Sequence, residues 1–75
     1  MRVKIKKIHE ESVYYSARED LIGAVGKFEL DECQVKIGKY KSGWFYPEHT
    51  IKYYDVLPVE ELKFYFFAVQ FEEIQ

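Results

Sequence analysis

The segment from Lys63 to Glu73, KFYFFAVQFEE, contains the longest apolar run of the chain and decides how the chain can fold. Successive side chains of a strand point to opposite faces, so alternate residues of this segment share a face. Both faces are apolar in the middle of the segment, which predicts a strand that is covered on both sides. Phe64, Phe66 and Ala68 form one face, and Tyr65, Phe67, Val69 and Phe71 form the other.

Shorter segments with a similar alternation come before it. Val3 and Ile5 alternate with basic residues, and Ile8 breaks the parity, which predicts a bulge or the end of a strand. Between the first two strands, residues 9–20 are expected to form a long ordered loop with at most one helical turn. The predicted strands are residues 2–6, 21–30, 34–37, 44–46, 51–57 and 63–73.

Two turns punctuate the second half of this pattern. Residues 41–43, Lys-Ser-Gly, are expected to form a short hairpin loop with Gly43 in the left-handed conformation, because glycine adopts it without steric cost. Pro47 cannot donate a hydrogen bond to a strand ladder, so the aromatic strand before it is expected to stop there.

The size and composition of the chain fit these short strands. Seventy-five residues of 9.0 kDa make a single domain, residues 1–75. Seven Tyr, six Phe and one Trp supply large rings, which give a small core much buried area per residue. We therefore predict an all-β fold: a small antiparallel barrel of five to six strands, with a C-terminal β-strand extension.

Two segments carry a resemblance to known small barrels, which covers roughly residues 3–57. Trp44-Phe45-Tyr46-Pro47-Glu48-His49-Thr50-Ile51 resembles the aromatic strand and proline-led 3₁₀ turn of Src-homology-3-like barrels. Residues 21–30, LIGAVGKFEL, are similar to the glycine-containing strand of KOW-type barrels. The pattern also resembles small barrel proteins encoded by phages and mobile elements. That resemblance implies a factor that docks onto a host or defence protein and inhibits it.

Charge and cysteine content exclude several classes. The net charge of −2 does not suit a protein that wraps nucleic acid through a large basic surface. A single cysteine, Cys33, allows no intramolecular disulfide, which fits a reducing compartment. The apolar run of residues 64–69 is shorter than the about 20 residues needed to cross a membrane as a helix. We expect a cytoplasmic protein without a membrane partner.

The chain shows no pattern typical of an enzyme. Its acidic residues occur mostly as adjacent pairs, which point to opposite faces of a strand and cannot converge as an acid–base pair. His9 and His49 are far apart in the sequence and lack the spacing of metal ligands. We therefore predict no catalytic, metal-binding or cofactor-binding residues.

The aromatic residues are the candidates for a binding site. Neighbours on a strand alternate between faces, so some of these rings must point outward. Exposed Tyr and Trp are favoured anchors of protein interfaces. We therefore predict a protein partner that binds Tyr14, Tyr15, Trp44, Tyr46 and Tyr54.

The sequence also allows two other functions. Lysines near aromatic rings can hold phosphates while the rings stack on bases, which would make the chain a nucleic-acid-binding barrel. The strand Lys63–Glu73 could instead pair across a homodimer and make the chain a structural subunit. The residues expected to contact nucleic acid are Arg2, Lys4, Lys6, Lys36, Lys39 and Lys41.

Overall fold

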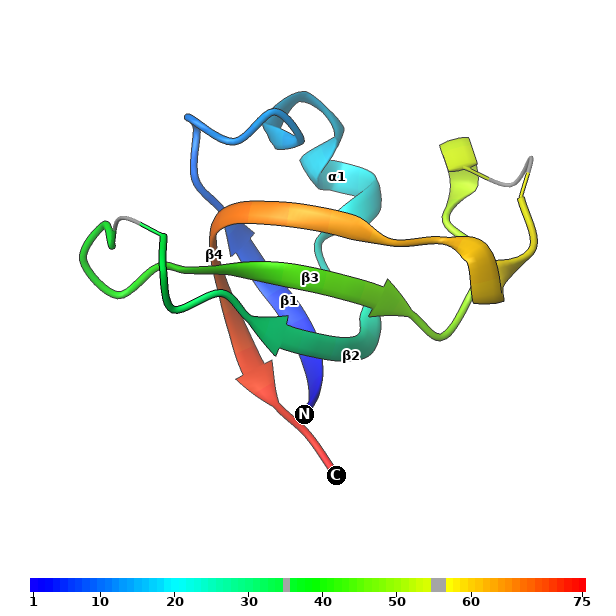
Figure 1. The fold of residues 1–75 in the computed structure, drawn as a ribbon. Helices are drawn as coiled ribbons and strands as arrows, with labels where there is room; N and C mark the ends of the chain where they lie inside the picture. The colour runs from blue at the N-terminus through cyan, green and yellow to red at the C-terminus, as the bar shows by residue number, and fades with distance from the viewer. Residues whose placement is uncertain (35, 55–56) are drawn as a thin grey trace.

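Four strands form one antiparallel sheet in the computed structural model, which describes residues 1–34, 36–54 and 57–75 (Figure 1). Strand β1 pairs with β2 and β4, and β3 also pairs with β2 and β4, so the sheet closes on itself. The two termini lie close together, and Ile74 N donates a hydrogen bond to Arg2 O at 2.9 Å. The strands are β1 (Arg2–Ile8), β2 (Val25–Leu30), β3 (Lys41–Pro47) and β4 (Phe64–Glu73).

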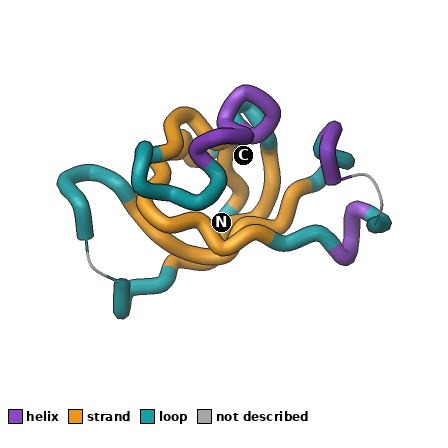
Figure 2. Tube along the Cα trace, turned by 90° about the horizontal axis from the view of Figure 1, so that it is seen from above, coloured by secondary structure: helices purple, strands orange, loops and turns teal. Residues whose placement is uncertain are grey.

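Short helical segments connect these strands. Figure 2 shows η1 and α1 lying across one end of the curled sheet, while η2 and η3 lie together at one side. Leu21, the last residue of α1, is fully buried and joins the core from that end. The segments are η1 (Tyr15–Ala17), α1 (Arg18–Leu21), η2 (Lys52–Tyr54) and η3 (Val59–Glu61).

Phenylalanine rings fill the inside of the sheet. Phe66 stacks on Phe45 with ring centroids 5.5 Å apart and on Phe64 at 5.8 Å. Phe45 and Phe66 are fully buried, so each removes a large apolar area from water. Aliphatic residues of β1 and β4 complete the core: Val3, Ile5, Ile8 and Val69.

The alternation of β4 changes at Ala68. This residue has a φ of 59°, and the pairing of β3 with β4 shifts register beside it, which is the signature of a β-bulge. Ala68 and Val69 are therefore both buried, and Phe71 then reaches the core, where its ring lies 4.7 Å from that of Phe28. The expectation that Val69 and Phe71 share a face with Tyr65 is wrong for this reason.

Hydrogen bonds hold the bulge in place. Ala68 N donates to the buried Ser42 Oγ at 2.9 Å, and Ala68 O accepts a bond of the same length from His9 N. A second register shift lies between Ile5 and Lys7 in β1. It confirms the irregularity predicted from Ile8, which breaks the alternation of Val3 and Ile5.

The mainly β fold and the long last strand are confirmed, but the number of strands is lower than predicted. The last strand is part of the closed sheet and not a C-terminal extension of it, and the helical segments exceed the single turn that was expected. Residues 52–54 form a 3₁₀ turn, whereas Asp55 and Val56 of the predicted strand lie outside the described residues. Ile37 makes an isolated bridge to Tyr40 rather than joining the sheet, and Val35 of that predicted strand also lies outside the described residues. The described residues thus contain four strands instead of five or six.

The hairpin between β2 and β3 also differs from the prediction. Its turn lies at Gly38, which has a φ of 52°, and not at residues 41–43. Gly43 lies inside β3 and has no left-handed conformation. A Cβ atom at Gly43 would collide with Glu29 O, and one at Gly26 would collide with Tyr46 O. Both glycines therefore allow β2 and β3 to approach each other closely.

The Ser42→Ala variant should lower the free energy of unfolding by about 1–3 kcal/mol, because it leaves the buried N–H of Ala68 without an acceptor. Urea denaturation measures this loss. Ser16→Ala is the matched control, since Ser16 is exposed and should change stability little. Equal stability of the two variants would contradict the role assigned to Ser42.

The Gly43→Ala variant should lower the free energy of unfolding by about 3 kcal/mol or more, because a Cβ atom would push apart the backbones of β2 and β3. Gly38→Ala places the same methyl group in open space and should lose only about 1–2 kcal/mol from its positive φ. Thermal melting of both variants measures the difference. A larger loss of stability in Gly38→Ala than in Gly43→Ala would contradict the close approach of β2 and β3 at Gly43.

Candidate functional site

Three rings lie on the outward side of β3 and β4. Trp44 and Tyr46 are two residues apart on β3, so they share a face, and Tyr65 of β4 pairs directly with Trp44. Phe45 lies between them in the sequence and is fully buried, which confirms that its neighbours point the other way. We call Trp44, Tyr46 and Tyr65 the outer aromatic face.

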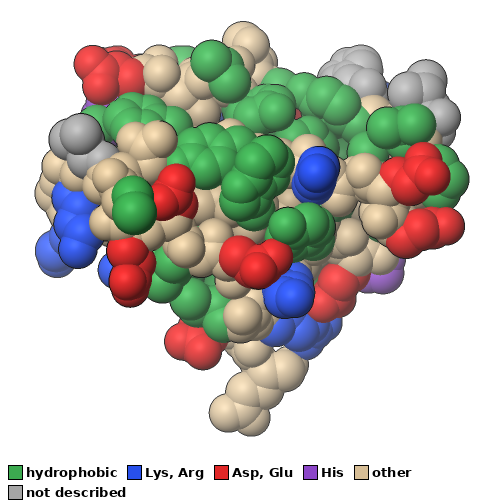
Figure 3. Space-filling view, viewed as in Figure 1, with side chains coloured by type: hydrophobic (Ala, Val, Ile, Leu, Met, Phe, Trp, Pro, Cys, Tyr) green, Lys and Arg blue, Asp and Glu red, His purple; other side chains and the backbone are tan. Residues whose placement is uncertain are grey.

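The indole of Trp44 is the most exposed part of this face. The residue retains 40% of its accessible surface. Its ring packs edge-on against Tyr65 with centroids 5.2 Å apart, and Lys63 Nζ lies 5.3 Å from its centroid. Figure 3 shows apolar and aromatic side chains gathered over β3 and β4, bordered by acidic and basic groups. The ring is therefore held in position while much of its surface meets solvent.

Charged residues of β2 lie beside the face. Glu29 pairs with Trp44 in the ladder and Lys27 pairs with Tyr46. Hydrogen bonding with Glu29 raises the pKa of the Tyr46 phenol above its ordinary value. Lys27 Nζ lies 6.0 Å from the centroid of the Tyr46 ring.

A hydrogen bond links the face to the loop between β2 and β3. Tyr65 Oη donates to Asp31 Oδ2 at 2.7 Å, and Cys33 N donates to Asp31 Oδ1 at 3.0 Å. Burial, and then the hydrogen bond to Asp31, raise the pKa of the Tyr65 phenol. Asp31 thus fixes the start of the loop relative to β4.

The other predicted aromatic site residues lie elsewhere. Tyr14 packs edge-on against Phe64 and Phe66 at 5.4 and 5.5 Å, and burial raises the pKa of its phenol. Tyr54 packs against Phe64 at 5.0 Å. These two rings cover the core, whereas the half-buried Tyr15 lies beside Arg18, whose guanidinium carbon is 4.1 Å from its ring centroid. Of the predicted set, the structure therefore places Trp44 and Tyr46 on the outer face, whereas Tyr14 and Tyr54 meet over Phe64.

The predicted basic residues separate into two groups. Arg2 forms an ion pair with Glu48, with Nε 2.6 Å from Oε2 and Nη2 3.0 Å from Oε1, and its Nη1 donates to Gln75 O. Lys4 lies opposite Glu72 in the ladder of β1 and β4. The positive charge of the first strand is therefore accompanied by acidic residues. Lys6 is exposed beside the register shift, and Lys36, Lys39 and Lys41 lie far along the chain at the β2–β3 loop.

The strand predicted to mediate a homodimer, Lys63–Glu73, corresponds to β4. Residues 64–69 of this strand pair with β3 and residues 69–73 pair with β1, so the two pairings meet at Val69.

None of the described helices is long and apolar enough to cross a membrane. Within residues 1–34, 36–54 and 57–75, no group of three or more His, Cys, Asp or Glu side chains is arranged to hold a metal ion. No protein-family model matches the chain, and neither the curated proteins nor the solved structures include a significant match to it.

Sequence reasoning missed Tyr65 and Asp31. Tyr65 was expected on an apolar face of the last strand, and its position opposite Trp44 could have been inferred only from the register of β3 and β4. The contact with Asp31 joins residues 34 positions apart, which no local pattern reveals.

The Tyr65→Phe variant should remove one phenol that ionises above its ordinary pKa of 10.0. A raised pKa means that folding favours the protonated phenol. Its contribution to stability is therefore complete below pH 10 and is lost as the pH rises through the folded-state pKa. Ultraviolet titration of phenolate should show one late-ionising group fewer in the variant, with stability falling less steeply in alkali. If the phenol lost from the titration curve is instead one that ionises near pH 10, the assignment is contradicted.

Proposed function

We propose that the chain is a non-catalytic protein-binding module that docks through its outer aromatic face. The observation that carries this proposal is the outward cluster of Trp44, Tyr46 and Tyr65 on a closed sheet whose inside is filled by Phe28, Phe45, Phe64 and Phe66. Every strand of the closed sheet has two partner strands within the chain, so we assign the recognition to outward side chains rather than to an added strand.

The arrangement of these rings suits a binding hot spot. Trp and Tyr bring a large contact area at low cost in side-chain entropy. The edge-on contact with Tyr65 and the nearby ammonium of Lys63 hold the Trp44 indole before any partner arrives. A preorganised anchor loses less entropy on binding, so more of its contact energy appears as affinity.

The proposal includes a finer fold assignment, a Src-homology-3-like barrel. The closed antiparallel sheet supports it. The resemblance of residues 44–51 and 21–30 to such barrels, including those of phages and mobile elements, gives the partner class. We propose a phage-encoded factor that binds and inhibits a host or defence protein in the cytoplasm.

The Trp44→Ala variant should lose its protein partner while remaining folded. Truncating a hot-spot residue costs about 2 kcal/mol or more, which weakens binding by about 30-fold. Partners are captured from bacterial lysate by cross-linking, identified by mass spectrometry, and their affinities are then measured with purified components. Circular dichroism and melting curves establish that the variant is folded.

Val13→Ala is the matched control, because Val13 is the most exposed large apolar residue among those described and lies in the loop before η1. It should retain the wild-type affinity. The proposal fails if a purified partner binds Trp44→Ala as tightly as the wild type, or if Val13→Ala has the larger effect.

A further inference from the structure

A second surface, distinct from the outer aromatic face, lies around the turn between β2 and β3. Lys36, Lys39 and Lys41 are all exposed there, and Tyr40 lies among them. Tyr40 N donates to Ile37 O at 2.9 Å, and the same two residues form an isolated antiparallel bridge. Gly38, with its φ of 52°, takes the first central position of this two-residue turn, as type II′ turns require. The turn is therefore a defined hairpin tip that carries three lysines.

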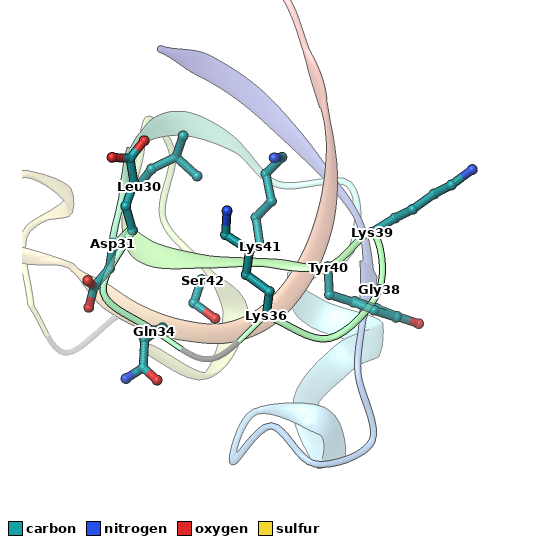
Figure 4. A pocket seen from close by; sticks show the side chains of 10 residues that line it. Leu30, Asp31, Gln34, Lys36, Gly38, Lys39, Tyr40, Lys41 and Ser42 are labelled. Carbon is teal, nitrogen blue, oxygen red and sulfur yellow. The ribbon is translucent and has the colours of Figure 1, made fainter.

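The hairpin places two lysines next to each other. Lys36 and Lys41 lie on either side of the Ile37–Tyr40 bridge in the sequence and line the same hollow. Figure 4 shows both side chains extending along the same side of the turn, whereas Lys39 points away from them. Like charges that line one small hollow repel each other. None of the three lysines forms an ion pair within the described residues, so an external anion would relieve this repulsion.

The end of β1 adds another positive charge and a second aromatic group. Lys7 Nζ lies 5.8 Å from the centroid of the Tyr40 ring, and the His9 ring packs edge-on against Tyr40 at 4.9 Å. Tyr15 reaches the same hollow from the helical segment, so Lys7, Tyr15 and Tyr40 line one concave surface. Rings and ammonium groups are therefore interleaved at this end of the sheet.

Hollows continue along both sides of the turn. Lys39 and Lys41 line one with Gln70 of β4. Lys36 and Lys41 line another of about 120 Å³ that reaches Asp31 and Glu32. The Asp31 carboxylate already accepts hydrogen bonds from Tyr65 and Cys33, as described above. Four exposed lysines, including Lys7, outnumber by one the three acidic groups that line these hollows, Glu10, Asp31 and Glu32.

We propose that this surface, Lys7, Lys36, Lys39, Lys41, Tyr15 and Tyr40, binds single-stranded nucleic acid. Lysines spread along connected hollows suit successive phosphates, and aromatic rings between them suit unpaired bases. Paired bases are already stacked in a duplex and cannot reach the tyrosines, so single strands are favoured. Arg2 is not part of this surface, because Glu48 neutralises it.

The test is fluorescence anisotropy of a labelled oligothymidylate of about 15 nucleotides, a length near the upper site size of small single-strand binders. Four phosphate contacts on a single strand predict about a 50-fold loss of affinity between about 50 and 200 mM NaCl. The double variant Lys36→Gln with Lys41→Gln should flatten the salt dependence by about half, because two of the four contacts are removed.

Tyr40 separates base stacking from charge attraction. Tyr40→Leu should weaken oligothymidylate binding by about 5- to 150-fold, whereas Tyr40→Phe keeps the ring and should bind as the wild type does. Neither change should alter the inhibition constant of inorganic polyphosphate, which has no bases. Lys63→Gln makes the same charge change as one lysine of the turn, but on the outer aromatic face, and should weaken binding less than twofold, on the order of experimental scatter.

Several results would overturn the proposal. These are the absence of binding at the lower salt concentration, equal affinity for duplex DNA, equal affinity of Tyr40→Leu and wild type, or loss of binding in Trp44→Ala. The last result would place the nucleic acid on the outer aromatic face. Because Trp44→Ala should leave oligothymidylate binding unchanged, failure of this inference is distinguishable from failure of the protein-docking proposal.

Discussion

Closing a sheet of four strands demands strong curvature, and the other features of this molecule depend on how the chain meets that demand. Gly26 and Gly43 let β2 and β3 approach closely because neither carries a Cβ that would strike the facing backbone. Register shifts in β1 and at Ala68 in β4 supply the extra bending on the opposite side of the ring. Ala68 adopts a left-handed φ that is unfavourable for alanine, and hydrogen bonds to Ser42 and His9 hold it there.

Closure also decides which rings serve stability and which remain available. A small ring of strands has room for few large side chains, and Phe45, Phe64 and Phe66 occupy it as a stack. Alternation along β3 then forces Trp44 and Tyr46 outward. Pairing of β3 with β4 brings Tyr65 beside Trp44. The outer aromatic face is thus a geometric consequence of filling the inside with phenylalanine, and its rings are held by the same strands that form the core.

Much of this arrangement could be predicted from local sequence, and the remainder depends on long-range contacts. Alternation identified β1, the aromatic part of β3 and β4, and the broken parity of Ile8 indicated the irregularity in β1. The strand predicted over residues 21–30 is β2 only from Val25 onward, because Leu21 ends α1 instead. The turn at Gly38 was missed, because any of several glycines could have filled that role. Tyr14 and Tyr54 are aromatic residues like Trp44, and the sequence alone does not distinguish their roles. In the structure they cover Phe64 because the helical segments pack against that end of the core. The pairing of Tyr65 with Asp31 depends on tertiary structure alone.

The central claim is that the sheet is closed and thereby sorts the rings into buried and outward sets. Nuclear Overhauser spectroscopy of the labelled protein tests it most directly at Val3, which pairs with Gly26 on one side and Glu73 on the other. A closed sheet predicts cross-strand contacts from the backbone protons of Val3 to both of these residues in one spectrum. Contacts to only one of them would mean an open sheet and would contradict the account.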